Sequence, residues 1–330
     1  MQENKSLVDP FGRKIEYVRL SVTDRCNLRC FYCLPKGYKD FDAPHDWLGI
    51  DEISRIVAAF GRLGVSRIRI TGGEPLVRRD LPELVAKLNG LPGIEDLSLS
   101  TNAVHLARDA DALKRAGIAR INVSLDTLDA RKFSDITSGG KLEKVLQGLM
   151  AAKRSGLSPI KINMVAMKGI NDDEVEDMTD FCIDHGFTLR FIETMPVGDS
   201  GRKASEHYLD LSEVKERLRQ RYVLTPGIMP GGGPARYMQV QGTDLRIGFI
   251  TPLSQHFCET CNRVRLSVEG DLHLCLGKDH SVALRPLLRE GISDEVLEQA
   301  LVDALRLKPE RHHFRESPYE VLRFMSKTGG

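Results

Sequence analysis

Residues 15–33 read IEYVRLSVTDRCNLRCFYC, and this stretch decides the fold. Residues 15–22 form a β-rich run in which apolar and polar side chains alternate, which is typical of a β-strand with two different faces. Three cysteines follow at once, in the spacing Cys26-x3-Cys30-x2-Cys33. The chain has only seven cysteines, too few for a disulfide scaffold at this length, so the clustered thiols indicate metal or redox chemistry.

Short β-rich runs and helical patterns continue to alternate as far as residue 194. We expect strands at 15–22, 65–70, 95–100, 118–124, 159–165 and 187–192. We expect helices between them at 51–63, 79–89, 105–116, 141–155 and 172–185. Such alternation predicts a parallel sheet built from right-handed βαβ units.

The first five expected strands each carry polar side chains on one face. With period two, the polar sets are Arg19, Ser21 and Thr23; Arg67, Arg69 and Thr71; Ser98, Ser100 and Asn102; Arg120, Asn122, Ser124 and Asp126; Lys161 and Asn163. A packed barrel interior would carry branched apolar residues instead. For one or two strands, a solvated sheet face is the simpler interpretation. Five in succession favour a curled sheet with a polar lumen that binds something large and anionic.

Composition narrows the function classes. The chain has 330 residues, and 47 Lys and Arg nearly cancel 46 Asp and Glu, so no global basic field attracts nucleic acid. No apolar run approaches the roughly 18 residues of a membrane span. The N-terminal residues lack the apolar stretch of a signal peptide. We expect a cytoplasmic protein that binds neither nucleic acid nor membrane.

The sequence pattern changes near residue 225, where the regular alternation of strands and helices ends. We place there a boundary between a core of residues 8–225 and a subdomain of residues 226–330. A Pro- and Gly-rich stretch precedes a second cysteine triplet, Cys258-x2-Cys261-x13-Cys275. Around this triplet we expect strands at 235–240, 245–250 and 263–268, then helices at 281–290 and 293–307.

Each triplet has two chemical interpretations. Three thiolates hold three irons of a four-iron, four-sulfur cluster and leave one iron open, or they form three corners of a zinc site. For the second triplet, the zinc interpretation takes His256 or His273 as fourth ligand. The seventh cysteine, Cys182, lies in a helical pattern and is expected to be a buried small hydrophobe.

The first triplet, with Tyr32 before its last cysteine, resembles the signature of the radical S-adenosylmethionine superfamily. The segment Thr71-Gly72-Gly73-Glu74-Pro75 is similar to the superfamily's GGEP segment. The resemblance implies an α/β fold, a partial (β/α)6 TIM-like barrel. With the second triplet, we expect a C-terminal subdomain that carries a second iron–sulfur cluster.

The second cysteine triplet narrows the resemblance from the superfamily to one family within it. Cys258, Cys261 and the following Asn262-Arg263-Val264-Arg265, with Cys275, resemble the C-terminal motif of the GTP 3′,8-cyclase family of molybdenum cofactor biosynthesis. The terminal Gly329-Gly330 is similar to that family's double-glycine tail. Ser100 and Ala103 depart from the family's usual Thr-Thr-Asn-Gly, although Ser100 keeps the hydroxyl.

The resemblance implies two [4Fe-4S] clusters and S-adenosylmethionine as cofactors. The cluster of Cys26, Cys30 and Cys33 binds S-adenosylmethionine, which is cleaved on reduction to a 5′-deoxyadenosyl radical. The matching S-adenosylmethionine contacts are Tyr32, Gly73, Ser124 and Met195.

The resemblance also implies that GTP sits between this cluster and that of Cys258, Cys261 and Cys275. The radical removes the ribose 3′ hydrogen, and C3′ then attacks guanine C8. The product is (8S)-3′,8-cyclo-7,8-dihydroguanosine 5′-triphosphate. The matching GTP contacts are Arg19, Arg69, Ser100, Lys161, Arg263, Val264 and Arg265. Candidate catalytic residues beyond the clusters are Arg263, Arg265, Gly329 and Gly330.

Partners follow from the same resemblance. They are a flavodoxin- or ferredoxin-like electron donor and, by pathway, a downstream cyclic pyranopterin monophosphate synthase, with the chain itself a monomer or homodimer. Two alternatives stay open on the sequence, a radical enzyme that modifies a peptide and a non-catalytic module with two zinc sites. The lumen cations and the Gly-Gly end favour a triphosphate substrate over a peptide.

Overall fold

A curved sheet of six parallel strands forms the centre of the computed structural model, which describes residues 6–39, 41 and 44–329. The strands lie side by side in chain order and are β1 (Tyr17–Ser21), β2 (Arg67–Thr71), β3 (Asp96–Thr101), β4 (Arg120–Ser124), β5 (Ile160–Val165) and β6 (Thr188–Ile192). This arrangement confirms the parallel sheet that the alternating pattern predicts and the partial (β/α)6 barrel that the resemblance implies.

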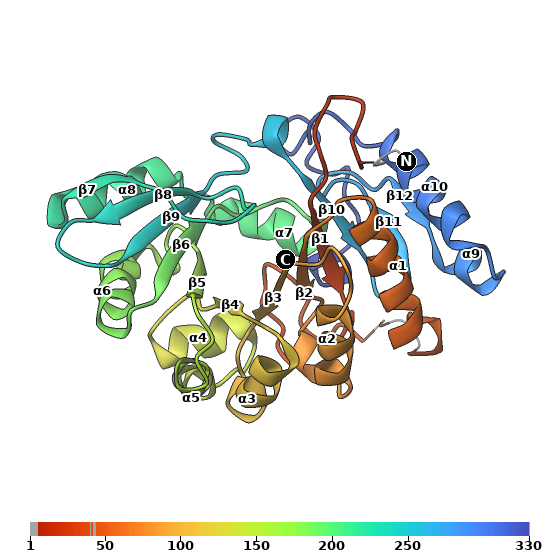
Figure 1. Cartoon of the computed structure of the whole chain (residues 1–330). Coiled ribbons are helices and arrows are strands. Elements are labelled where there is room, and N and C mark those ends of the chain that lie inside the picture. The colour runs from red at the N-terminus through yellow and green to blue at the C-terminus, as the bar shows by residue number, and fades with distance from the viewer. Residues whose placement is uncertain (1–5, 40, 42–43, 330) are drawn as a thin grey trace.

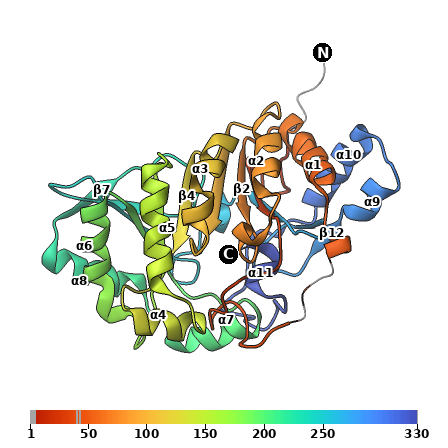
Figure 2. The ribbon, with the colours of Figure 1, turned by 90° about the horizontal axis from the view of Figure 1, so that it is seen from below.

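Helices cover the outer face of this sheet (Figures 1 and 2). They are α1 (Ile50–Arg62), α2 (Leu81–Asn89), α3 (Leu106–Ala116), α4 (Ala130–Thr137), α5 (Leu142–Arg154) and α6 (Val175–His185). Between them and the strands lies one large hydrophobic core, which includes Val18, Ile68, Leu99 and Ile121. The apolar strand residues thus meet the helices, which leaves their polar neighbours on the inner face.

The C-terminal third of the chain extends the same sheet at both ends. On one side β10 (Arg263–Leu266) pairs parallel with β1, followed by β11 (Asp271–His273) and β12 (Ser281–Ala283). On the other, β9 (Arg246–Ile250) pairs parallel with β6, followed by β8 (Arg236–Val240) and the edge strand β7 (Leu224–Gly227). The result is one sheet of twelve strands.

The remaining elements lie outside the six-stranded centre. The helices are α7 (Gly198–Ala204), α8 (Leu211–Arg221), α9 (Arg285–Arg289), α10 (Asp294–Leu305) and α11 (Met325–Thr328). The 3-10 turns are η1 (Pro44–Asp46), η2 (Pro75–Val77), η3 (Asp172–Glu174), η4 (Ser205–His207) and η5 (Cys258–Thr260). None of the helices in the described part of the chain is long and apolar enough to cross a bilayer.

Two local expectations are wrong. The helix expected over 281–290 begins only at Arg285, because residues 281–283 pair with β11 as a strand. Residues 319–325 also have apolar side chains at helical spacing, which predicts a helix, but the helix begins only at Met325. The preceding segment is held by tertiary contacts instead, since the Arg323 guanidinium donates to the carbonyls of Cys275 and Leu276 at 3.0 and 2.8 Å.

Candidate functional site

The concave face of the sheet carries two adjoining pockets. The first pocket is lined by Cys26, Cys30 and Cys33, and the second pocket by Arg-rich strands and the second cysteine triplet. Residues common to both linings are Ser100, Asn163, Ile192, Met195 and Met325. The two cysteine triplets, more than 200 residues apart in sequence, therefore open into one continuous lumen.

The cysteine loop of the first pocket is packed against the Gly-rich turn after β2. Gly73 N–H donates to the Thr23 carbonyl at 2.7 Å, and Glu74 N–H donates to the Arg25 carbonyl at 2.8 Å. A Cβ at Gly73 would lie 2.3 Å from the Arg25 oxygen, so only glycine permits this approach. Burial raises the pKa of Cys26 to about 11 and that of Cys33 to about 12.

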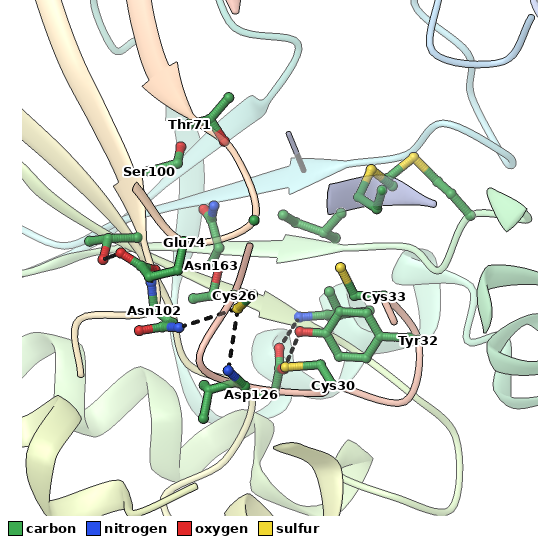
Figure 3. A pocket seen from close by; sticks show the side chains of 18 of the residues that line it. Cys26, Cys30, Tyr32, Cys33, Thr71, Glu74, Ser100, Asn102, Asp126 and Asn163 are labelled. Carbon is green, nitrogen blue, oxygen red and sulfur yellow. Dashed lines mark hydrogen bonds between the residues drawn. The ribbon is translucent and has the colours of Figure 1, made fainter. Parts of the chain in front are cut away.

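Buried carboxyl groups fix the walls of the first pocket (Figure 3). The Tyr32 hydroxyl donates to Asp126 at 2.6 Å, and Val165 N–H donates to the other oxygen of that carboxyl at 2.9 Å. Glu74 accepts from the Thr101 hydroxyl and from Asn102 N–H, both at 2.6 Å. Burial raises the pKa of Asp126 to about 6 and that of Glu74 to about 7. The hydrogen bond to Asp126 holds the ring of Tyr32 in one orientation beside the cysteines.

The second pocket contains five arginines among otherwise largely apolar lining residues. Its arginines are Arg19, Arg69, Arg190, Arg263 and Arg265. Burial, followed by repulsion from neighbouring arginines, lowers the pKa of Arg19 to about 9, and burial also lowers that of Arg190 to about 10. The Nε atoms of both are buried, and within the described structure neither has a hydrogen-bond partner. Buried cations at this density, two of them with an unpartnered Nε donor in the described structure, are suited to a polyanionic ligand.

A third, smaller pocket continues from the second toward the amino-terminal ends of the strands. It is enclosed by the segment 229–235 and lined by the cations Arg67, Arg69, Arg120, Lys161 and Arg190. Burial and the neighbouring cations Arg190 and Arg120 lower the pKa of Lys161 to about 7. This end of the lumen is therefore suited to the phosphate groups of an extended ligand.

The second triplet lies at the far wall of the second pocket. Cys258 begins η5, Cys261 precedes β10, and Cys275 follows β11. Burial raises the pKa of Cys261, but the cations of Arg263 and Lys308 outweigh it and the pKa falls to about 7. Among the described residues, no group of three His, Cys, Asp or Glu side chains is arranged to hold a single metal ion.

The described part of the C-terminal tail, as far as Gly329, lies in the lumen near β1 and β2 (Figure 1). Met325 at the start of α11 lines both main pockets, and Thr328 is fully buried. Arg265 donates to the Thr328 carbonyl at 3.1 Å and to the Gly329 carbonyl. Gly330 lies outside the described residues.

Most of the residues expected from sequence line these pockets, and Val264 does not. Tyr32, Gly73, Ser124 and Met195 line the first pocket, whereas Lys161 lines the third. Val264 is 1% exposed and belongs to the hydrophobic core, because side chains alternate along β10 and its neighbours Arg263 and Arg265 take the inner face.

Several lining residues were missed by sequence reasoning. Arg190 lines the second and third pockets, and its signal was available, since Thr188, Arg190 and Ile192 alternate along β6 with the period used for the other strands. Glu74 and Asp126 lie in segments that the sequence singles out. The fold was needed to show that they bind the Asn102 amide and the Tyr32 hydroxyl.

The chain resembles known proteins over its whole length. Residues 20–182 match the Radical SAM superfamily, and residues 187–314 match the family Molybdenum Cofactor Synthesis C. A GTP 3′,8-cyclase of Hydrogenovibrio crunogenus is 50% identical over 98% of this chain and 100% of its own length. This chain belongs to the GTP 3′,8-cyclase family.

Two more GTP 3′,8-cyclase family members lie nearly as close. The GTP 3′,8-cyclase of Ectopseudomonas mendocina is 47% identical, and GTP 3′,8-cyclase 2 of Pseudomonas aeruginosa is 48% identical, each over 98% of both chains. Among solved structures, Streptococcus suis SuiB bound to S-adenosylmethionine superposes with a TM-score of 0.64 at 16% identity. That match covers 89% of this chain and 68% of SuiB, and it supports the fold.

Proposed function

We propose that this chain converts GTP to (8S)-3′,8-cyclo-7,8-dihydroguanosine 5′-triphosphate, the first step of molybdenum cofactor biosynthesis. Membership of the GTP 3′,8-cyclase family supports the reaction. The observation that carries it is the continuous lumen, which has a cysteine triplet in each main pocket and buried cations in the second and third pockets. A peptide substrate would not need this concentration of buried cations.

The donor sets fit two iron–sulfur clusters. Thiols are the usual protein ligands of such clusters, and each triplet turns its three thiols toward one pocket. Cys26, Cys30 and Cys33 would hold the cluster to which S-adenosylmethionine binds, and Cys258, Cys261 and Cys275 a second. When bound, the first cluster and S-adenosylmethionine supply the radical that removes the ribose 3′ hydrogen.

The protein side chains would bind and orient the two ligands, S-adenosylmethionine and GTP. Tyr32, Gly73, Ser124 and Met195 would contact S-adenosylmethionine, with the Tyr32 ring held by its bond to Asp126. Arg19, Arg69, Arg190 and Lys161 would bind the triphosphate, with Arg263 and Arg265 near the base. Met195 lines both main pockets and so lies where the two ligands meet.

The direct test is a product assay under anaerobic conditions. Protein reconstituted with iron and sulfide is incubated with dithionite, S-adenosylmethionine and each ribonucleoside triphosphate separately. We expect 5′-deoxyadenosine and the cyclised nucleotide with GTP. Cyclisation of no nucleotide, by a protein that still cleaves S-adenosylmethionine, would contradict the proposal.

Replacing Arg69 or Lys161 with Ala should weaken GTP binding and leave S-adenosylmethionine binding unchanged. Loss of one charge-assisted bond to phosphate costs about 1.5–3 kcal/mol, which is roughly ten- to a hundredfold in affinity. Titration calorimetry measures the affinity for GTP and for S-adenosylmethionine. Arg62, which pairs with Asp294 and Glu298 on the outer surface, provides a control as Arg62→Ala. Unchanged GTP affinity in both lumen variants would exclude the lumen as the GTP site.

GTP affinity should also fall as the pH rises above 7. Lys161 has a pKa of about 7 without ligand, and a nearby phosphate raises that pKa, so above pH 7 binding takes up a proton. The affinity then decreases by up to about tenfold per pH unit. The charged groups that act on Lys161 are Arg190, Arg120, Arg69 and Asp96, and the Tyr237 ring lies 5.8 Å from its ammonium.

Calorimetry at pH 8 in two buffers of different ionisation enthalpy counts this proton. We expect close to one proton taken up per GTP. Lys161→Arg is the control, because arginine stays charged at this pH and should remove the uptake. Equal uptake in both proteins would assign the proton to another group.

A further inference from the structure

Buried cations hold all three segments that carry the second cysteine triplet. Arg13 donates to the Cys258 carbonyl at 2.7 Å, and Arg323 donates to the Cys275 carbonyl at 3.0 Å. The Lys308 ammonium lies 4.0 Å from the Cys261 sulfur. These cations come from the N-terminus, the segment after α10 and the C-terminal tail, so the triplet is fixed by distant parts of the chain.

Lys308 differs from the two arginines because it reaches a sulfur and bridges two of the segments that carry the cysteines. It is 3% exposed, and it donates to the Arg263 carbonyl at 2.9 Å and to the Leu274 carbonyl at 2.6 Å. With the Cys261 sulfur, these make three acceptors for the three protons of one ammonium group. Cys261 and Cys275, which lie beside those carbonyls in sequence, are thereby tied together.

The charge of Lys308 is also balanced differently. Arg13 pairs with Asp9 at 2.6 Å, and Arg323 pairs with Asp279. Within the described part of the chain, no carboxylate forms an ion pair with Lys308. A buried ammonium without a counterion is costly, so its position is explained if the group held by the thiols carries negative charge.

An iron–sulfur cluster provides that charge. Three thiolates on a four-iron, four-sulfur core of charge +2 give a net charge of −1, and one-electron reduction makes it −2. A fixed cation beside a ligating sulfur stabilises both states and favours the reduced one more. Net charge and hydrogen bonds to sulfur are among the factors that set the potentials of such clusters.

We propose that Lys308 is a positioning residue for the second cluster. It ties the Cys261 and Cys275 segments together through two carbonyls, supplies the counter-charge for the thiolates, and raises the reduction potential of the cluster. This inference rests on the proposed second cluster at Cys258, Cys261 and Cys275.

The experiment isolates the second cluster in the full-length chain. A parent protein with Cys26, Cys30 and Cys33 replaced by Ser is reconstituted with iron and sulfide, and Lys308→Gln and Lys308→Arg are compared in that background. Gln keeps an N–H donor without charge, and Arg keeps the charge. The readouts are the rate of iron loss to a chelator and the midpoint potential from an EPR-monitored redox titration.

We expect Lys308→Gln to lose iron roughly 10- to 100-fold faster than the parent, the usual effect of removing an outer partner of a metal ligand. Its midpoint potential should be lower, while that of Lys308→Arg should stay near the parent's. Lys278→Met is the matched control, because that lysine binds Glu320 and His313 in the same region and contacts none of the three cysteines. Circular dichroism of the iron-free proteins identifies a folding defect separately.

The outcomes separate the two levels of inference. A parent that holds no four-iron cluster overturns the proposed second cluster itself. A parent with a normal cluster, and a Lys308→Gln variant with unchanged potential and iron loss, overturns the role of Lys308 alone. If Lys308→Gln and Lys308→Arg lower the midpoint potential equally, charge is not the cause. That result also overturns the proposed role of Lys308.

Discussion

Replacing Cys258, Cys261 and Cys275 with Ser should abolish the cyclised nucleotide while S-adenosylmethionine is still cleaved. The two triplets line separate pockets, so we expect cleavage to need only the proposed cluster ligands of the first. Iron should fall from about eight to about four atoms per chain. Iron analysis and chromatography of 5′-deoxyadenosine and the nucleotide product measure all three quantities in one preparation.

Cys182 provides the matched control. It is fully buried in α6 and lines neither pocket, so Cys182→Ala removes a thiol without touching either triplet. Iron content and product should be unchanged in that variant. Full iron content in the triple Ser variant would show that the second triplet holds no cluster, and normal product would show that GTP does not need it.

The lumen was predictable because strand periodicity is local. Arg19 and Arg69 each sit between two buried apolar neighbours, and Ser100 sits between the buried Leu99 and Thr101, so period two places all three on the inner face. The six parallel strands follow from the same pattern. No structure was needed to infer that five consecutive strands turn polar side chains to one side.

Tertiary contacts explain what the pattern missed. Residues 281–283 are a strand only because β11 lies beside them, and the edge strand β7 tolerates Pro226 because its outer side has no partner strand. Lys308 is one lysine among many in sequence. Its proposed role follows only from the three acceptors around it, which belong to segments 34 to 47 residues away.

Changing Gly329 should stop cyclisation without affecting either proposed cluster. Its φ is +72°, and a Cβ there would lie 2.1 Å from Cγ2 of Thr71, at the end of β2 beside the Gly-rich turn. Gly329→Val therefore adds backbone strain and a direct collision, and the tail must leave its place. We expect product formation to fall roughly a hundredfold or more, since misplacement by about 1 Å has effects of that size.

Gly186 provides a control for a valine at positive φ. Its φ is +69°, close to that of Gly329, and a Cβ there meets nothing within 4 Å. Its ψ of 33° lies in the left-handed helical region, whereas the ψ of Gly329 is 126°, so Gly186→Val carries a smaller backbone strain. This variant, at the end of α6 and away from the lumen, should keep its product yield, which would show that a valine at positive φ does not by itself stop cyclisation.

The tail variant also decides what the tail contributes. Arg265 donates to the carbonyls of Thr328 and Gly329, so a displaced tail frees an arginine of the second pocket. If the tail only fills space, Gly329→Val should bind GTP at least as tightly as the unmodified chain and still form product. If the tail orients Arg265 for the reaction, GTP binding and S-adenosylmethionine cleavage persist while the cyclised nucleotide disappears. We expect the second result, because the guanidinium is buried and the tail carbonyls fix its direction.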